Sequence, residues 1–539
     1  MYKAKDEKIE PVRITPEVKR NHIHLLLLTQ RSDNPDDVMD SKTHYCWIKD
    51  LSRLISNQVS SHRGRHYFCD RCLNYFHRLA LLEEDRINCG KQNVCGIEMP
   101  AGGDDIIKFR NTKNQLKAPF VIYADVKALL KTPTEPFCKQ YGNKPVKTVA
   151  YQKHEVYSIG YYFKCEFDDS KPFYKSYRGK DCIEWFVKEL HDASSIFNQI
   201  YDNSQPLRMS AEDIENFENA VICHICGEGL AMSYKGPAVR DHCHFTGEYR
   251  GAAHQSCNLE YRDSRTVPVV FHNLSNYDSH FLIRELAVGF PGELRVISIN
   301  KEKYISFIKT AADSSNKFNC MIKFKFIDSF RFMASSLDRL SSLIPSDKKT
   351  LLRNEFKDIS DEQMQLLERK WVFCYDYVDS WERLEETELP SKEAFYSKLT
   401  DEKVSDKDYA FATEVWNKFN VKTLGEYADL YLKVDVCLLA IVFENFRETC
   451  HQIYKLDPAN YYTSPGLSFD AMLRYTKVEL SLLTDVDMLL FVERGIRGGI
   501  SQCSKRHVEA NNKYMETFDK EKESTHITYI KRSKHYTTH

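Results

Sequence analysis

The sequence lacks several features that mark fibrous, disordered or membrane-anchored chains. Glycine supplies only 20 of the 539 residues, whereas Tyr and Phe supply 31 each, which argues against a disordered or fibrous chain. Internal repeats and low-complexity tracts are absent. The longest early apolar run, Leu25–Leu28, is far shorter than a membrane span, and the first ten residues, MYKAKDEKIE, lack the apolar core of a signal peptide. We therefore expect an intracellular protein with no membrane partner.

The chain also lacks net charge, because the formal charge is −1. This excludes a uniformly basic nucleic-acid coat but not a local basic groove. The stretch 301–357 has 12 Lys/Arg against 6 Asp/Glu, whereas 358–408 has 7 against 15. The acidic stretch is typical of a solvated helical surface. In the basic stretch, the alternation Phe324-Lys325-Phe326 predicts a strand whose basic face is wet and turned towards phosphates.

Length and cysteine content define the expected organisation. At ~100–200 residues per domain the chain should form three to five domains, and 42% hydrophobic with 28% charged residues is an ordinary globular composition. The chain has 17 cysteines, an odd number. In an intracellular setting we expect these thiols to be reduced or to bind metal.

Paired spacings predict a zinc site between residues 223 and 257. Cys223 and Cys226 form one Cys-x2-Cys half-site, and His254 and Cys257 form a second pair with the same spacing. A tight turn can present two ligands at this spacing, and structural zinc takes four nitrogen or sulfur ligands in a tetrahedron. Because two such pairs rarely occur so close together by chance, we predict that these four side chains bind zinc.

Asp241, His242, His244 and Asn258 accompany the zinc ligands, and the arrangement resembles the His-Asn-His nucleases, most closely the endonuclease VII type. The resemblance implies that Asp241 and Asn258 bind a catalytic Mg²⁺ and that His242 activates water against a phosphodiester, with His244 auxiliary. The alternative is a zinc knuckle that stabilises an insertion, with Asp241 and Asn258 capping turns. The surrounding sequence favours this alternative.

Two carboxylates follow strand-like apolar runs on either side of the zinc cluster. The strand-like run Phe120–Ala124 ends at Asp125. Asp278 closes the stretch that follows Val267–Phe271. Carboxylates at strand ends commonly hold two Mg²⁺ ions ~4 Å apart for phosphoryl chemistry. An isolated Asp after a strand is more often a turn or cap residue.

A third carboxylate lies in a segment with helical periodicity, Tyr427–Tyr454. Tyr431 and Asp435 are four residues apart, so a helix places both on one face. There Asp435 can hold a metal while Tyr431 orients the attacking water. Alone, this spacing is more typical of ordinary surface and core residues.

In their order, these motifs resemble the Exo I, Exo II and Exo III motifs of the 3′→5′ exonuclease of family B DNA polymerases. Longer stretches resemble the protein-primed polymerases of Polinton/Maverick-type mobile elements: YAD at 123–125, FHNLS at 271–275, FIDSFRF at 326–332 and LDPANYYTSPGLS at 456–468. The resemblance implies an α/β, RNase H-like mixed sheet with helices and a nuclear location. It implies catalysis by Asp125, Asp278, Tyr431 and Asp435 with Mg²⁺. It also implies DNA contact at Asn273, a single-stranded 3′ end or primer-template as partner, and a terminal protein for priming.

The chain departs from this family at Lys127. Exo I normally reads Asp-x-Glu, but here it reads Asp125-Val126-Lys127. An ammonium replaces a carboxylate ligand, which repels Mg²⁺ and cannot coordinate it while protonated. We therefore predict impaired exonuclease activity.

A second Cys-rich segment lies near the N-terminus and resembles a zinc finger with Cys, Cys, His and Cys ligands. Asp85 occupies the position expected for His, and the fourth ligand is left open. The alternative is an eroded finger with reduced thiols, and contact with DNA or a partner is a further expectation. The candidate ligands are Cys69, Cys72, His77, Asp85, Cys89 and Cys95.

The stretch ERGIRGG at 493–499 resembles the Gly-Gly junction between exonuclease and polymerase domains. The resemblance implies that Gly498 and Gly499 allow close approach of the backbone to a template, while Arg494 and Arg497 meet phosphates. The alternative is an ordinary loop. In the resembling family a strand like 526–530 precedes the first palm carboxylate, yet no Asp or Glu follows Glu523 here. We expect a polymerase cut at this motif that does not add nucleotides; a basic DNA-binding tail is the alternative.

Five segments are expected: a zinc-finger-like region at 1–116, exonuclease parts at 117–212 and 263–454, a zinc insertion at 213–262, and a polymerase start at 455–539. The function implied by resemblance is DNA-directed DNA polymerase in the replication of a mobile element. One rival is a structure-selective endonuclease acting through the insertion. The other is an inactive relic that binds nucleic acid.

Overall fold

The computed structural model describes residues 2–5, 8–11, 23–29, 43–59, 65–70, 74–92, 99–100, 104–132, 152–168, 172–231, 233–300, 303–312, 321–496 and 509–527. Cys72, Cys95, Arg497, Gly498, Gly499 and residues 528–539 lie outside this part, as does the Arg494 side chain. The chain forms two compact units, Lys108–Glu479 and a second made of Met1–Ile107 with Leu480–His539. We describe each unit separately. None of the described helices is both long and apolar enough to cross a membrane.

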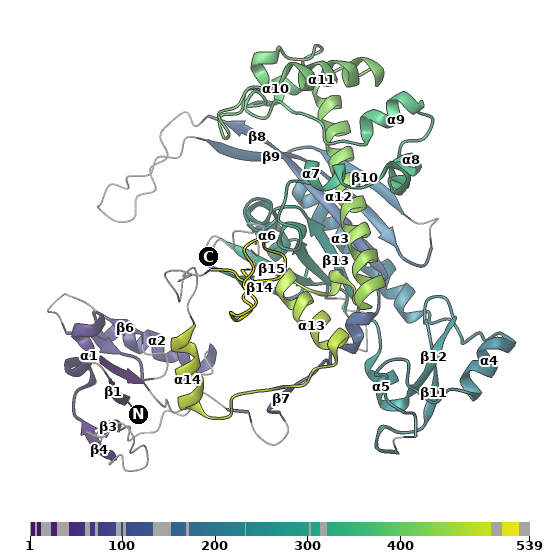
Figure 1. The fold of residues 1–539 in the computed structure, drawn as a ribbon. Coiled ribbons are helices and arrows are strands. Elements are labelled where there is room, and N and C mark those ends of the chain that lie inside the picture. The colour runs from purple at the N-terminus through teal and green to yellow at the C-terminus, as the bar shows by residue number, and fades with distance from the viewer. Residues whose placement is uncertain are drawn as a thin grey trace. The chain divides into compact units, whose positions relative to one another are not determined.

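The larger unit is built on a mixed seven-stranded sheet (Figure 1). The central strand β13 is parallel to both of its neighbours, β8 and β16, and the outer pairings are antiparallel. In sheet order the strands are β10 (Phe173–Arg178), β9 (Lys153–Cys165), β8 (Phe120–Lys131), β13 (Thr266–Phe271), β16 (Lys323–Asp328), β15 (Tyr304–Thr310) and β14 (Leu294–Ser298).

Helices cover both faces of this sheet. Successive side chains of a strand point to opposite sides, so a strand with a continuous apolar run has an apolar surface on each face. Val121 and Tyr123 of β8 pack with the long helix α12 (Leu424–Tyr454). Phe120 and Ile122 pack on the other face with α3 (Cys182–Asp202) and α6 (Ser279–Val288). The result is the predicted α/β architecture, with one apolar core on each side of the sheet.

Helix α12 confirms the predicted helical segment and extends it at its start. The Thr423 side chain accepts a hydrogen bond from the Glu426 amide, which is the usual N-cap interaction. The helix ends where Lys455 adopts a left-handed conformation, with φ of 52°. Between these caps lie more than twenty residues of helix packed on β8 and β9, so α12 fixes Tyr431 and Asp435 against the sheet.

Two sequence-based expectations about strands are wrong. Strand β8 does not end at Asp125 but continues to Lys131, paired with β9 throughout. Lys325 does alternate with its Phe neighbours, but its side chain is only 5% exposed, so it is not on a wet face. The segment 457–462 and the residues before β8 cover that side of β16, which the local pattern could not reveal.

The acidic stretch 358–408 is also more than the solvated surface that was expected. Its acidic side chains are mostly exposed, but Leu367, Trp371 and Leu384 are buried in the core beside α12. The helices in and around it are α7 (Leu337–Ser342), α8 (Thr350–Glu355), α9 (Asp361–Leu367), α10 (Trp381–Leu384) and α11 (Asp406–Lys418). Short 3-10 helices span Thr112–Gln115, Ser233–Lys235, Ser329–Arg331, Ser346–Lys348, Lys392–Phe395 and Pro458–Asn460.

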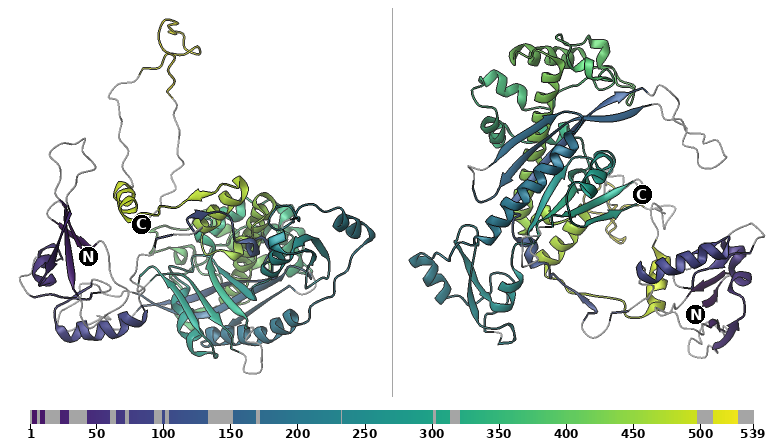
Figure 2. Two further views of the ribbon diagram at one scale, coloured as in Figure 1. Left: turned by 90° about the horizontal axis from the view of Figure 1, so that it is seen from below. Right: turned by 180° about the vertical axis from the view of Figure 1, so that it is seen from behind.

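Residues between α3 and β13 form a small module with its own core (Figure 2). It consists of α4 (Ala211–Glu218), the antiparallel pair β11 (Ala238–His242) and β12 (Tyr249–His254), and α5 (Gln255–Glu260). A capping box between Ser210 and Asp213 starts α4. The strand register shifts between Asp241 and His242, which marks a bulge. After α12, helix α13 (Ser464–Thr476) completes the larger unit.

The smaller unit contains a four-stranded sheet in the order β2-β1-β3-β4 and several short elements. Ile48, Leu51, Ile55 and Phe68 form its apolar cluster. Its elements are β1 (Tyr2–Lys5), β2 (Lys8–Pro11), β3 (His24–Thr29), β4 (Thr43–Ile48), α1 (Leu51–Val59), β5 (Tyr67–Phe68), β6 (Tyr75–Phe76), α2 (Leu79–Gln92), β7 (Ile106–Ile107), β17 (Leu480–Ser481) and α14 (Val486–Gly495).

Candidate functional site

The carboxylates of Asp125 and Asp435 meet at the ammonium of Lys127. Asp125 and Lys127 are two residues apart on β8, so both point to the α12 face of the sheet. Lys127 Nζ lies 2.7 Å from Asp125 Oδ2 and 2.6 Å from Asp435 Oδ2. Both distances are those of charge-assisted hydrogen bonds. The three side chains therefore form a closed ionic bridge between strand and helix, which we call the Lys127 bridge.

A second cation and two tyrosines complete this cluster. Lys370 Nζ donates to Asp435 Oδ2 at 2.8 Å. The Tyr375 and Tyr431 hydroxyls are 2.6 Å apart. Lys127 Nζ lies 4.3 Å from the centroid of the Tyr431 ring, within cation–π range. Tyr431 and Asp435 thus share one helix face, as their spacing predicts, and both contact the same lysine.

Burial and charge act in opposite directions on the ionisable groups of the Lys127 bridge. Burial would lower the pKa of Lys127, but the carboxylates of Asp125 and Asp435 raise it well above the usual lysine value. Burial would likewise raise the pKa of Asp435, but Lys127 and Lys370 lower it. The bridge is therefore held in its charged form, with ammonium and carboxylates each stabilising the other.

Asp278 lies in the field of the same groups. It is only 3% exposed and occupies the N-cap position of α6 without a side-chain capping bond. Burial, followed by the negative charge of Asp125, raises its pKa well above the usual aspartate value, and Lys127 opposes this shift. Strand β13 and α6 therefore place the third predicted carboxylate where the charges of Asp125 and Lys127 act on it.

Asn273 lies in the tight turn between β13 and α6, with a φ of 71°. Its backbone amide and that of Ser275 donate to the buried carboxylate of Asp328, at 2.8 and 3.0 Å. The Asn273 side-chain oxygen accepts from Asn276 at 2.8 Å. This network fixes the turn that carries Asp278, and DNA contact at Asn273 stays a prediction.

These side chains do not fit a pair of divalent cations as they stand. Mg²⁺ requires oxygen ligands around the ion, and the ammonium of Lys127 takes the position between Asp125 and Asp435. Asp435 Oδ1 is a buried carboxylate oxygen with no hydrogen-bond partner in the described part of the chain. In this chain an internal cation thus neutralises the carboxylates that would otherwise attract metal.

Sequence reasoning missed Lys370, Tyr375 and Asp328 in this site. Lys370 and Tyr375 precede α10 in a segment without a helical or strand period, so no local signal marked them. Asp328 stands in the quoted stretch 326–332, and its position at the end of a parallel strand could have identified it. Its carboxylate sits beside Asn273, at the edge of the sheet where β13 also ends.

The four predicted zinc ligands converge in the small module between α3 and β13. Their ligand atoms, from Cys223, Cys226, His254 and Cys257, all lie within 4.8 Å of one another. His254 Nδ1 is 3.5 Å from Cys226 Sγ and 3.7 Å from Cys257 Sγ. Its Nε2 is 3.0 Å from the Gly229 carbonyl oxygen. Donation by Nε2 leaves Nδ1 free to bind metal, which is the usual arrangement around zinc.

The predicted Mg²⁺ ligand Asp241 is instead held by Arg250 and His224 of the protein. Arg250 donates to both carboxylate oxygens of Asp241, at 2.8 and 2.7 Å. His224 Nε2 lies 3.0 Å from Asp241 Oδ2. Burial would raise the pKa of Asp241, but His224 and Arg250 lower it. His242 and His244 lie side by side with ring centroids 4.9 Å apart, and Asn258 is on α5.

In the smaller unit, the ligand atoms of Cys69, Asp85 and Cys89 lie within 4.8 Å of one another. His77 is not part of this group; its ring packs against those of His66 and Tyr75. Among the described candidates, the geometry therefore groups Asp85 with the two cysteines.

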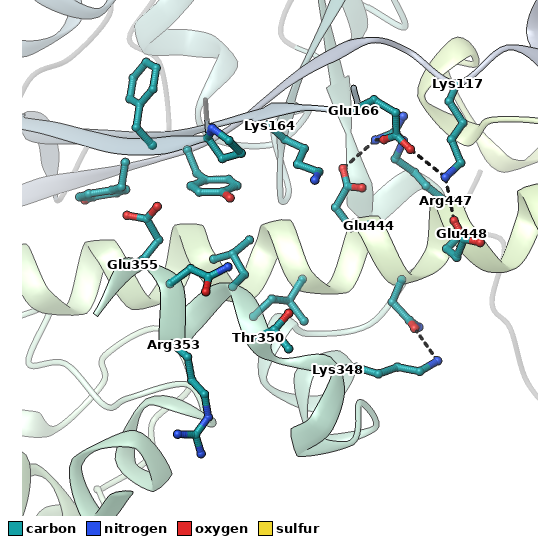
Figure 3. A pocket seen from close by; sticks show the side chains of 18 of the residues that line it. Lys117, Lys164, Glu166, Lys348, Thr350, Arg353, Glu355, Glu444, Arg447 and Glu448 are labelled. Atoms are coloured by element: carbon teal, nitrogen blue, oxygen red, sulfur yellow. Dashed lines mark hydrogen bonds and ion pairs between the residues drawn. The ribbon is translucent and has the colours of Figure 1, made fainter. Parts of the chain in front are cut away.

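A cavity of about 1190 Å³ in the larger unit lies beside α12 and away from these predicted residues (Figure 3). Several of its charges are paired within the protein. Lys117 contacts Glu166 and Glu448 at 2.8 Å each, and Arg447 contacts Glu444 at 2.7 Å. Size alone therefore does not mark a functional site here.

Comparison with known proteins adds a family match. Residues 259–519, a little under half of the chain, match the family described as DNA polymerase type B, organellar and viral. No curated protein matches the chain.

Two solved structures are similar to parts of the chain. One is Phi29 DNA polymerase complexed with primer-template DNA, at 11% identity and a TM-score of 0.26, covering 66% of this chain. The other is the same polymerase with primer-template DNA and incoming nucleotide substrates, at 11% identity and a TM-score of 0.23, covering 67%. In both cases the likeness covers 35% of the polymerase chain.

Proposed function

We propose that this chain is part of a protein-primed, family B DNA-directed DNA polymerase and contributes a 3′→5′ exonuclease-like domain that binds a single-stranded DNA end. The family match over residues 259–519 supports the polymerase assignment. The convergence of Asp125, Asp278 and Asp435 at one edge of a mixed sheet supports the exonuclease-like assignment, together with Tyr431 beside them. The RNase H-like identity of the sheet belongs to the same proposal.

The observation that carries the proposed state of this site is the Lys127 bridge. Its ammonium bonds to both carboxylates at 2.7 and 2.6 Å. The protein thus places its own cation between the carboxylates that would hold a metal ion during phosphodiester cleavage. We infer that exonuclease activity is lost or strongly reduced while the fold and strand binding are kept.

Digestion of 3′-labelled single-stranded DNA tests this inference. The wild-type chain should release no nucleotides with Mg²⁺, whereas Lys127→Glu should do so in Mg²⁺ and not in EDTA. Because Lys370 also contacts Asp435, Lys127→Glu/Lys370→Gln should be at least as active. The control Lys127→Glu/Asp435→Asn should be inactive. Equal activity of the wild-type chain and Lys127→Glu would refute the inference.

The resemblance also suggests the biological setting. We assign to the whole protein the replication of a Polinton-like mobile element in the nucleus, with a terminal protein that primes synthesis. Deoxynucleotide linked covalently to a co-expressed terminal protein would support this assignment. Synthesis that starts only from a DNA primer, with no nucleotide linked to the terminal protein, would count against it.

We propose that the module between α3 and β13 is a zinc-stabilised structural insertion. Support comes from the four clustered ligand atoms and from the Arg250 contacts that occupy both oxygens of Asp241. Metal analysis should find zinc in the wild-type chain and one equivalent less in Cys226→Ser. Cys243→Ser is the matched control, because Cys243 lies in the same module outside the ligand group. Cleavage of supercoiled DNA that disappears in His242→Ala would contradict a purely structural role.

The group Cys69, Asp85 and Cys89 is proposed as a second zinc site in the smaller unit. Cys69→Ser should remove a further equivalent of zinc without affecting the first. Unchanged zinc content in Cys69→Ser would leave these side chains as buried thiols beside an aspartate.

A further inference from the structure

A second cavity of the larger unit contains cationic side chains that have no hydrogen-bond or ion-pair partner among the residues that the structure describes. It has a volume of about 260 Å³ and lies between β16, the residues before β8 and the segment around Tyr462. None of the exonuclease-like residues lines it. We use the name basic cavity for the site lined by Lys113, Arg262, Lys323, Lys325 and Tyr462.

The cations of the basic cavity differ from those of the larger cavity in their partners. Lys113, Arg262 and Lys323 make no side-chain hydrogen bond or ion pair within the described part of the chain. Lys117, which lines both cavities, is already bound by Glu166 and Glu448. The acidic side chain in the lining is Asp263. Positive charge therefore exceeds negative charge in this cavity and is not neutralised internally.

Lys325 is the cation that most needs a ligand. The strand alternation sends Phe324 and Phe326 into the core beneath α3, which turns Lys325 to the opposite side. Its side chain is 5% exposed and makes no hydrogen bond or ion pair in the described chain. Its Nζ lies 5.2 Å from the Tyr462 ring centroid. Burying an ammonium without a partner is costly, and a bound anion would offset that cost.

The surroundings of Lys325 show how weak its present support is. Burial lowers its pKa to about 7, with Asp457 raising it and Lys113 lowering it. Asp457 is committed elsewhere, because its carboxylate accepts from Arg447 at 2.9 and 2.6 Å and from two backbone amides. The carboxylate that raises the pKa of Lys325 is therefore already bound by other groups of the protein.

The lining also indicates the form of the anion. A neighbouring cavity of about 470 Å³ shares Lys113, Arg262, Asp263 and Ser264 with the basic cavity and adds one further cation, Arg110, and one carboxylate, Glu260. The cationic lining thus continues beyond one phosphate group. Tyr462 is 37% exposed and presents a ring at the cavity, and rings beside a cationic groove are the usual means of holding single strands. A linear polyanion with successive phosphates matches this arrangement.

We propose that the basic cavity binds the phosphate backbone of a DNA single strand, at a site separate from the Lys127 bridge. The proposal rests on the proposed function, since it assumes that the chain contacts DNA. It adds a second contact, at which a strand would be held whether or not the nuclease site is active.

Binding of a fluorescein-labelled oligothymidylate, measured by anisotropy in EDTA, tests the proposal on the full chain. Lys113 and Arg262 are exposed, so Lys113→Gln/Arg262→Gln should fold normally. We expect it to weaken binding on the order of tenfold and to reduce the salt-dependence slope by about 1.4, or about 0.7 for each lost phosphate contact. Lys348→Gln/Arg353→Gln, which makes the same charge change at the larger cavity, should bind within about twofold of wild type. Lys325→Met should also bind more weakly.

The outcomes separate this proposal from the others. Equal loss in the two double variants would overturn it, because the effect would then be one of net charge. Wild-type oligonucleotide affinity in Lys113→Gln/Arg262→Gln, combined with loss of a phosphate-induced rise in Tm, would show a site for free phosphate and would also overturn it. Failure of the wild-type chain to bind the oligonucleotide would overturn both this proposal and the proposed function.

Discussion

Lys127 and Lys325 are two buried lysines on strands of one sheet, with opposite electrostatic surroundings. They are 6% and 5% exposed, respectively. Lys127 bonds to two carboxylates, which raise its pKa against the effect of burial. Lys325 has no such bond to any described residue, and burial lowers its pKa to about 7. The pKa values of two almost equally buried lysines therefore shift in opposite directions. The partners that the tertiary structure supplies decide the direction.

The largest expected effect is the loss of the Lys127 bridge in Lys127→Met. Removing one member of a buried ionic group leaves the others uncompensated, which costs about 3–5 kcal/mol. Because Lys370 still contacts Asp435, we expect a value near the lower limit. Urea denaturation at pH 7 measures the change in the free energy of unfolding. An unchanged value would mean that the bridge contributes nothing to stability.

Replacing Lys127 by a glutamate, which can bind metal, should make the stability of the chain depend on Mg²⁺. In Lys127→Glu, a third carboxylate joins Asp125 and Asp435, and Mg²⁺ should then relieve their repulsion. At Mg²⁺ concentrations 100 times the dissociation constant, we expect stabilisation of about 2.7 kcal/mol. Thermal unfolding with Mg²⁺ or EDTA measures this difference. The wild-type chain is the control, and an equal Mg²⁺ response in both proteins would contradict the comparison.

Replacing Lys325 should raise the free energy of unfolding, whereas replacing Lys127 should lower it, and the effect at Lys325 should depend on pH. Its pKa is about 7 in the folded chain and near 10.5 when unfolded, so the unfolded chain binds more protons between these values. Wild-type stability should therefore rise with pH across this range, by up to about 1.4 kcal/mol for each unit. Below pH 7 both states are protonated and the cost of burial is fully present.

Lys325→Met removes the titrating group, so its stability should not follow this slope. At pH 7 we expect Lys325→Met to be more stable than wild type, with a difference that shrinks by pH 9. Urea denaturation at both values, without DNA, measures it. A difference that stays constant between pH 7 and 9 would contradict this prediction, because it would mean that the folded chain keeps Lys325 protonated over that range, as a partner in solution would require.

A third lysine on the same strand as Lys127 gives the smallest effect. Lys131 pairs with Glu155 at 2.9 Å, but the two side chains are 34% and 32% exposed. Partly exposed ion pairs contribute about 0.2–1 kcal/mol. We expect Lys131→Gln to cost no more than this, and less at high salt. A loss as large as that in Lys127→Met would remove the contrast between buried and exposed pairs.

Much of the candidate site could be predicted because local periods place neighbours on known faces. The spacing of Tyr431 and Asp435 puts them together on α12, and Asp125 and Lys127 share one face of β8 by strand alternation. The Cys223 and His254 half-sites converge as their spacing suggests. Their roles as exonuclease and zinc residues remain predictions.

Other parts could not be predicted because they depend on contacts between distant segments. Lys370 enters the site from a segment with no regular period, and Asp241 is held by Arg250 across the β11–β12 pair. Lys325 is buried because residues more than 100 positions later in the chain, including Tyr462, cover its side of β16. Local alternation specified its face but not what lies against that face.

The sequence by itself determined which side chains share a face, how the Cys223 and His254 half-sites are spaced, and that position 127 carries a lysine two residues after Asp125. Only the tertiary structure decided that Lys127 bonds to Asp435, 308 residues away, and that Lys325 makes no ion pair with a carboxylate of the described residues. The physical reason is that strand and helix periods act over a few residues, whereas electrostatic pairing depends on distance in space. Two lysines with similar local sequence patterns therefore acquire opposite roles.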